Sequence, residues 1–220
     1  MNFSGRIVRG SGGFTLLEML VSITIFTLLT STLLVKNSQF KGNVAITNLA
    51  YQMALSLREA QSYGVNVKGV ATAGGSPFSY TTPYGIHFDT TNTYLLFGDS
   101  HPAATGNAKS GNRVYTASDR LIRSYPLQVG NTIARFCVTR SSPAATTCSG
   151  VGGLTSLDVT FVRPQPDAVI REGAASGYAQ TSADSAAIYV KNDKGVCKGV
   201  SVTNVGQIGV IDSPTAAECP

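Results

Sequence analysis

A long apolar stretch near the N-terminus, residues 14–35, constrains this chain more than any other feature of its sequence. Its 22 residues contain one charged side chain, Glu18, and neither Pro nor Gly. An α-helix of this length rises about 33 Å, which is enough to cross the hydrocarbon core of a bilayer. A carboxylate inside such a helix costs about 3 kcal/mol or more unless it finds a partner. The stretch therefore predicts a membrane span in which Glu18 has a special use.

The sequence Gly-Phe-Thr-Leu-Leu-Glu at residues 13–18 resembles the processing site of type IV prepilins and type II secretion pseudopilins. In that family a membrane peptidase cuts after the glycine, and the new N-terminal Phe is then N-methylated. The resemblance implies cleavage after Gly13, N-methylation of Phe14 and an assembly role for Glu18. In the family this glutamate is thought to meet the positively charged N-terminus of a neighbouring subunit. Such a neighbour supplies the missing partner, because opposite charges attract strongly at low dielectric.

Two other interpretations of the apolar stretch stay open. It is a plain signal anchor if Glu18 snorkels to the interface or pairs within a helix bundle. A cleavable secretory signal fits less well, because its apolar region is short and ends at a small-residue cleavage site, whereas the candidate cut precedes this run. Arg6 and Arg9 lie before the stretch and favour a cytoplasmic N-terminus. Together with the resemblance, they predict a single-pass protein of the bacterial inner membrane whose C-terminal domain is periplasmic or extracellular.

Apolar residues at three- and four-residue spacing extend the helical pattern beyond the span. They are Ile46, Leu49, Ala50, Met53, Ala54, Leu57 and Ala60. This is the single stripe of an amphipathic helix, and Gly64 is the first good stop signal after it. We therefore expect one helix over residues 14–63. The expected segments are a leader (1–13), a transmembrane half-helix (14–35), an amphipathic half-helix (36–63) and an extracytoplasmic β domain (64–220).

The rest of the chain alternates in short β-type runs between turn residues. The runs are 84–89, 93–98, 113–116, 121–129, 132–140, 156–162, 168–171, 186–191, 199–205 and 207–211. Gly130-Asn131 predicts a tight hairpin between the runs on either side, and Asn-Asp-Lys-Gly at 192–195 predicts a turn. Residues 65–83 read as a loop and residues 101–112 as a mobile insertion.

These elements predict an α+β fold, in which a long N-terminal helix packs on an antiparallel, β-sandwich-like domain. Their order resembles the minor pseudopilin group of the GspH and FimT type. In that resemblance the segment from Cys197 to Val210 corresponds to the closing hairpin of the group.

All four cysteines lie in the C-terminal half of the chain: Cys137, Cys148, Cys197 and Cys219. Three pairings are possible, and proximity favours Cys137 with Cys148 and Cys197 with Cys219. Disulfides require an oxidising compartment, which agrees with a domain outside the inner membrane. A zinc site is the rival interpretation. Against a zinc site, the sequence contains no Cys-x-x-Cys motif, and neither His87 nor His101 stands at ligand spacing to a cysteine.

Motifs for catalysis are missing from the sequence. It holds no Gly-x-Ser-x-Gly elbow, no P-loop and no His-Glu-x-x-His helix, so we expect a protein that is not an enzyme and uses no cofactor. His87 falls within a strand pattern, where a satisfied sheet residue is expected. Asp89, Asp99 and Asp119 lie in or near loops and are candidates for calcium, although scattered aspartates usually solvate turns.

DNA binding is an alternative function, because some proteins of the FimT group act in DNA uptake. Its candidate residues are Arg113, Arg120 and Arg123, with Arg135 and Arg140 beside them in the sequence. A cluster of such cations would bind phosphate. Against this, Gln207 stands where a basic residue is expected, and the tail 212–220 carries only acids. Without Arg6 and Arg9 the chain keeps 15 basic and 12 acidic side chains, a balance of +3 that does not itself indicate nucleic-acid binding.

The function expected from the sequence is therefore that of a minor pilin or pseudopilin, a structural subunit of a type IV pilus or type II secretion pseudopilus. Its expected partners are the prepilin peptidase and methyltransferase, other pilin or pseudopilin subunits, and the inner membrane.

Overall fold

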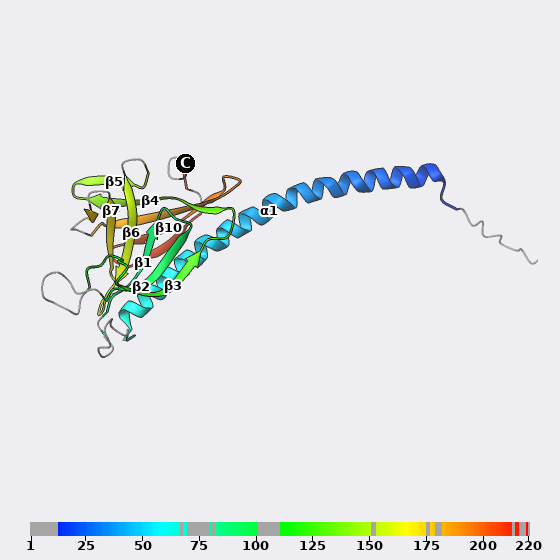
Figure 1. Cartoon of the computed structure of the whole chain (residues 1–220). Coiled ribbons are helices and arrows are strands. Elements are labelled where there is room, and N and C mark those ends of the chain that lie inside the picture. The colour runs from blue at the N-terminus through cyan, green and yellow to red at the C-terminus, as the bar shows by residue number, and fades with distance from the viewer. Residues whose placement is uncertain are drawn as a thin grey trace, which may run out of the picture. The chain divides into compact units, whose positions relative to one another are not determined.

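The computed structural model describes residues 13–66, 68–69, 80, 82–100, 111–150, 153–174, 177–178, 182–212, 214–215 and 219. The chain forms two units, residues 1–41 and residues 42–220. The elements in these described ranges follow one another as Figure 1 shows. They are α1 (Leu16–Val65), β1 (Tyr84–Asp89), β2 (Thr93–Gly98), β3 (Arg120–Pro126), β4 (Asn131–Ser141), β5 (Ala144–Cys148), β6 (Leu154–Phe161), β7 (Ala168–Ala174), β8 (Gly177–Tyr178), β9 (Ser185–Asn192), β10 (Cys197–Thr203) and β11 (Ile208–Ile211).

The strands form two antiparallel sheets in the unit of residues 42–220. One sheet has the order β3-β2-β1-β6-β7-β8, and the other has the order β11-β10-β9-β4-β5. Sequence neighbours β9, β10 and β11 form a meander, whereas β6 crosses to pair with β1. The predicted α+β class, a helix packed on antiparallel β-sheets, is confirmed.

The apolar stripe predicted for the second half of α1 is buried in the core. All seven of its residues, from Ile46 to Ala60, are at most 7% exposed. They share one hydrophobic cluster with residues of both sheets, such as Phe88 of β1 and Phe136 of β4. Polar contacts also reach both sheets. Glu59 accepts a hydrogen bond from the Tyr125 hydroxyl of β3 (2.9 Å), and Arg58 donates to the Ile208 carbonyl of β11 (3.3 Å). This half of α1 is therefore the spine of the β domain.

The predicted stop of the helix at Gly64 is wrong, because α1 continues through this glycine to Val65. Gly64 has a different physical role. A Cβ added there would lie 2.5 Å from the Phe161 carbonyl oxygen of β6, so the glycine lets the helix approach the strand backbone. The helix also begins at Leu16, two residues after the predicted start.

The hairpin predicted around Gly130-Asn131 is wrong in its pairing. The turn itself is present: the Asn131 N–H donates to the Gln128 carbonyl (3.0 Å), and Gly130 has a φ of 88°. However, β3 pairs with β2, and β4 pairs with β5 and β9, so this turn carries the chain from one sheet to the other. A tight turn fixes the local backbone only, and the strands here find better partners in separate sheets.

One predicted strand is absent, one further strand is present, and one turn prediction is confirmed. Residues 113–116 are not a strand, because the backbone N–H groups of Arg113, Tyr115 and Thr116 bind aspartate side chains instead of a neighbouring strand. The segment between Cys137 and Cys148, for which no separate strand was predicted, contains β5. The turn at 192–195 is closed by the Gly195 N–H, which donates to the Asn192 carbonyl (3.0 Å). Most of the loop expected at 65–83, and residues 101–110, lie outside the described residues.

Candidate functional site

The motif residues at 13–18 also start the first helix. Thr15 lies just before α1, and its hydroxyl accepts a hydrogen bond from the Glu18 backbone N–H (3.2 Å). This is the N-cap half of a capping box, and it satisfies one of the first N–H groups of the helix. The Gly13–Phe14 peptide bond therefore lies outside the hydrogen-bonded helix. Phe14 is 78% exposed, and a Cβ built on Gly13 meets no atom within 4 Å.

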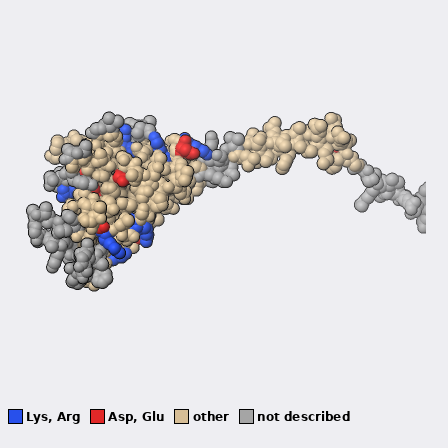
Figure 2. All heavy atoms as spheres, in the orientation of Figure 1, with Lys and Arg blue, Asp and Glu red and all other residues tan. Residues whose placement is uncertain are grey.

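The helix that follows is long and apolar enough to cross a membrane. The segment Leu16–Leu34 has the length and the apolar composition of a membrane span, and none of its side chains is buried in the structure. Figure 2 shows this part of α1 as a surface without Lys, Arg, Asp or Glu on the visible face. Six hydroxyls in it, those of Ser22, Thr24, Thr27, Thr30, Ser31 and Thr32, each donate to a carbonyl three or four residues earlier. Hydroxyls paired within the helix in this way are compatible with lipid.

Glu18 is the exception in this apolar helix. Its side chain is exposed, and within the described part of the chain its carboxylate has neither a hydrogen bond nor an ion pair. A carboxylate in lipid is costly unless it pairs with a cation.

A comparison with known protein families also singles out the N-terminal segment. Residues 8–34 match the family model of the prokaryotic N-terminal methylation motif. This is the N-terminal motif of the type IV pilin and pseudopilin class. The match includes Gly13, Phe14 and Glu18 together with the whole apolar helix. Proteins of this class are processed by prepilin peptidase and are typically structural subunits without enzymatic activity. No curated protein and no solved structure matches the chain.

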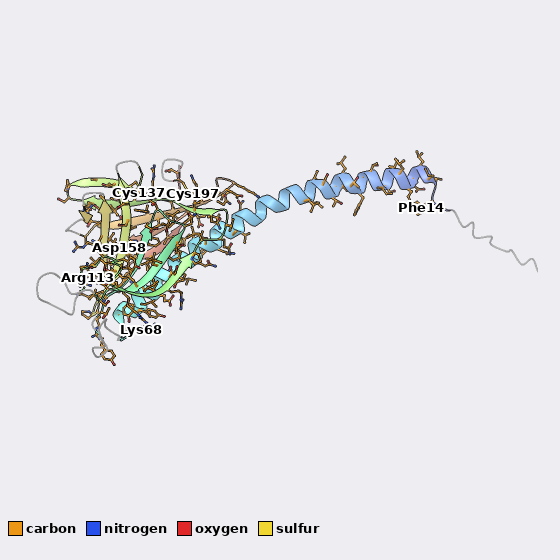
Figure 3. The ribbon with its side chains drawn as sticks, in the orientation of Figure 1. Phe14, Lys68, Arg113, Cys137, Asp158 and Cys197 are labelled. Atoms are coloured by element: carbon orange, nitrogen blue, oxygen red, sulfur yellow. A yellow bond between two sulfur atoms is a disulfide. The ribbon has the colours of Figure 1, made fainter. Side chains whose placement is uncertain are left out.

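The two predicted disulfides are present in the β domain. Cys137 is bonded to Cys148, which joins β4 to its neighbour β5, and Cys197 is bonded to Cys219, which ties the C-terminal segment to the start of β10. Figure 3 labels Cys137 and Cys197, which both belong to the five-stranded sheet. Because all four sulfurs are used in disulfides, they are not ligands of a zinc ion.

His87 is a buried residue with a partner in the neighbouring strand. Its Nδ1 lies 2.8 Å from Oδ1 of Asp158, a fully buried carboxylate that also accepts a hydrogen bond from the Tyr115 N–H (3.2 Å). Desolvation raises the pKa of Asp158, and the hydrogen bond from His87 opposes this rise. His87 is thus a satisfied sheet residue, as predicted. His101 lies outside the described residues.

The aspartates considered for calcium are hydrogen-bond acceptors for loops. Asp99 accepts from the Arg113 N–H (2.6 Å), and Asp119 accepts from the N–H groups of Ser100 (3.0 Å) and Thr116 (2.8 Å). These carboxylates hold residues 111–119 against the six-stranded sheet. Burial raises the pKa of Asp99 to about 6. Among the residues that the structure describes, no three His, Cys, Asp or Glu side chains form a group that could hold a metal ion.

The arginines considered for DNA have different environments. The Arg113 side chain is partly buried and its Nη1 fully so, while Arg123 Nη1 forms an ion pair with Oε2 of Glu59 (3.3 Å). Arg120 is exposed on β3, and Arg140 is paired with Glu172 of β7. On the face drawn in Figure 2, Lys and Arg side chains lie in separate groups and not in one continuous patch.

Sequence reasoning missed the part played by Asp158 and by the Asp99 and Asp119 anchors. Asp158 stands at an outward-facing position of β6, where a charged residue usually meets solvent. Its burial arises because residues 111–119 cover that face, and nothing in the local sequence pattern signals this long-range packing.

Proposed function

We propose that this chain is a minor pilin or pseudopilin, a structural subunit of a type IV pilus or a type II secretion pseudopilus. The observation that carries the proposal is the coincidence of three features within residues 8–34. The methylation motif, the capped start of α1 and an exposed apolar helix of membrane-spanning length all lie there.

In this proposal prepilin peptidase cuts between Gly13 and Phe14, and the new amine of Phe14 is methylated. The exposed peptide bond outside the helix supports this step, because a peptidase needs an extended, accessible substrate. Cleavage places a positive amine one residue before the N-cap of α1. The N-terminus of a helix carries partial positive charge, so the helix dipole adds to the positive potential that a neighbouring carboxylate meets there.

Assembly then follows from Glu18, whose carboxylate has no partner among the described residues, and from the exposed apolar surface of the span. The apolar faces of neighbouring helices pack together, and Glu18 of one subunit pairs with the Phe14 amine of the next. Phe14 lies four residues before Glu18, and the three steps from Thr15 to Glu18 follow the rise of the helix, so the axial offset between the paired subunits is about 6 to 8 Å. The carboxylate and the amine neutralise each other in a medium where either charge alone is costly.

The β domain faces the periplasm or the cell exterior in this proposal. Its two disulfides support an oxidising compartment. The helix, the two antiparallel sheets and the closing hairpin of β10 and β11 support the finer assignment to the GspH and FimT type.

The proposal is tested with two adjacent glycines in a host that contains prepilin peptidase. Gly13→Ala should leave uncut precursor in the membrane, because a side chain at the residue before the cut should hinder the peptidase. Gly12→Ala, the matched control one residue earlier, should be cut normally. Normal processing of Gly13→Ala would rule out the assigned cleavage site and, with it, the proposed route of assembly.

A further inference from the structure

The two sheets have four edges, which β3, β8, β11 and β5 form in the described part of the chain. The outer N–H and C=O groups of an edge strand invite pairing with another chain, so proteins usually protect them. β3 contains Arg120 and Arg123, ends at Pro126 and has an irregular register with β2. β8 is two residues long, and the Ile208 carbonyl of β11 accepts a hydrogen bond from Arg58 of α1 (3.3 Å). These three edges are therefore protected, and β5 is the exception.

β5 is an uncharged edge strand that a disulfide holds in place. Its sequence is Ala-Ala-Thr-Thr-Cys, and residues 144–147 are exposed. Cys148 is bonded to Cys137, its direct partner in β4, with a Cα–Cα distance of 4.0 Å. Figure 1 shows β5 beside β4 at the margin of the domain. The strand itself contains no bulge, proline or charge that would deter another strand from pairing with it.

The open backbone groups of β5 belong to Ala144 and Thr146. The Ser149 N–H donates to a carbonyl of β4 (2.8 Å), so the residues two and four positions earlier also face β4, because the direction of the bonds alternates along an antiparallel strand. The residues between them face outward. At Cys148 this outer side is covered, because a Cβ on Gly153 would lie 2.1 Å from its carbonyl oxygen. No hydrogen bond from another described residue reaches the backbone of Ala144 or Thr146.

We propose that β5 pairs with β5 of a second copy of this chain. The two strands run antiparallel about a two-fold axis at Ala145. Ala144 of one copy then lies opposite Thr146 of the other, and their backbones exchange two hydrogen bonds. The axis repeats this pair, so four hydrogen bonds join the two five-stranded sheets into one continuous sheet.

A second copy has the chemistry that this edge requires. A strand edge is completed by another extended strand with a free edge, and β5 is itself such a strand. Its small, uncharged side chains place no like charges opposite one another. Arg140, which lies opposite Ala145 in β4, is paired with Glu172 of β7.

The pairing goes beyond the proposed function and does not rest on it. A two-fold contact uses the same surface on both partners, so it closes on itself and does not continue into a filament. The paired form is therefore a state of the chain outside the filament.

The test is disulfide cross-linking of Ala145→Cys in the full chain, in detergent with micelles in excess of chains. The two Ala145 residues form a non-hydrogen-bonded pair, whose Cα atoms lie about 4.5 Å apart, within the range of a disulfide. Thr147→Cys is the matched control, because Thr147 is exposed on the same face of the same strand. In this register its two copies lie about 13 Å apart. Under a mild oxidant, Ala145→Cys should form covalent dimers at least about tenfold faster than Thr147→Cys.

A second pair of variants tests the edge itself in the Ala145→Cys chain. Thr146→Pro removes an outward N–H and leaves the ladder with β4 intact. Cross-linking should slow about tenfold, since two of the four hydrogen bonds between copies are lost. Thr146→Lys adds a charge at the edge and should act in the same direction, which decides the matter if the proline lowers Tm. Val205→Lys adds the same charge in the turn between β10 and β11, where Val205 is 59% exposed, and should change nothing.

Equal cross-linking of Ala145→Cys and Thr147→Cys, in chains whose two native disulfides are intact by peptide mapping, would overturn the inference. A cross-linking rate that Thr146→Lys leaves unchanged would overturn it as well. Neither result bears on cleavage after Gly13, so the pairing and the proposed function fail separately.

Discussion

The close contact between α1 and β6 makes Gly64 a sensitive position. In Gly64→Ala the added Cβ would lie 2.5 Å from the Phe161 carbonyl oxygen and 2.8 Å from its carbonyl carbon. These are backbone atoms of β6, which is paired on both sides by β1 and β7, so the strand cannot move aside cheaply. Overpacking of this kind costs about 1 to 3 kcal/mol. Replacing a helical glycine by alanine returns about 1 kcal/mol through helix propensity.

The two terms leave a net destabilisation of up to about 2 kcal/mol, or a fall in Tm of up to about 8 °C for a domain of this size. The measurement is urea and thermal unfolding of the full chain in detergent, followed by tyrosine fluorescence and circular dichroism. Asn48→Ala is the matched control, because Asn48 is exposed on the same helix. It should raise stability by about 0.5 kcal/mol through propensity alone. A Gly64→Ala chain as stable as the control would refute the assigned role of Gly64.

Two further predictions concern single carboxylates. Glu18→Gln should be cut and methylated but poorly incorporated into filaments, because the amide cannot neutralise a neighbour's amine; wild-type incorporation in sheared filament fractions would contradict the pairing. Asp99 has its pKa raised to about 6 by burial, so the folded chain binds a proton that the unfolded chain, with an aspartate pKa of about 3.9, has already released. The free energy of unfolding should therefore rise as the pH falls from 7 to 4, by up to about 3 kcal/mol for this residue. Asp99→Asn should flatten the pH profile, and an unchanged profile would show that Asp99 is not the titrating group.

The helix and most strands could be predicted because their signals are local. The stripe from Ile46 to Ala60 repeats at helical spacing, and every residue in it is buried as expected. The runs that became β1 and β2 have the predicted bounds, since each is a short apolar run between turn residues. The pairing of Cys137 with Cys148 also followed from their separation of 11 residues.

Strand pairing and the covered face of the six-stranded sheet could not be predicted in this way. The turn at Gly130 looks the same whether it closes a hairpin or joins two sheets, because the choice depends on the distant strands β2 and β9. The burial of Asp158 depends on a loop 43 residues away in sequence that donates the Tyr115 N–H. Similarly, the role of Gly64 as a stop was a local interpretation, whereas its physical role is contact with a strand almost 100 residues later.

The N-terminus of the native protein tests the central claim most directly. Intact-mass and N-terminal peptide mass spectrometry should be carried out on protein extracted from native membranes. The account predicts a mature chain of residues 14–220 that begins with N-methyl-Phe14 and retains both disulfides. A chain that keeps Met1, or one that is cut near residues 32–36, would contradict it and leave a signal-anchored or secreted β domain in its place.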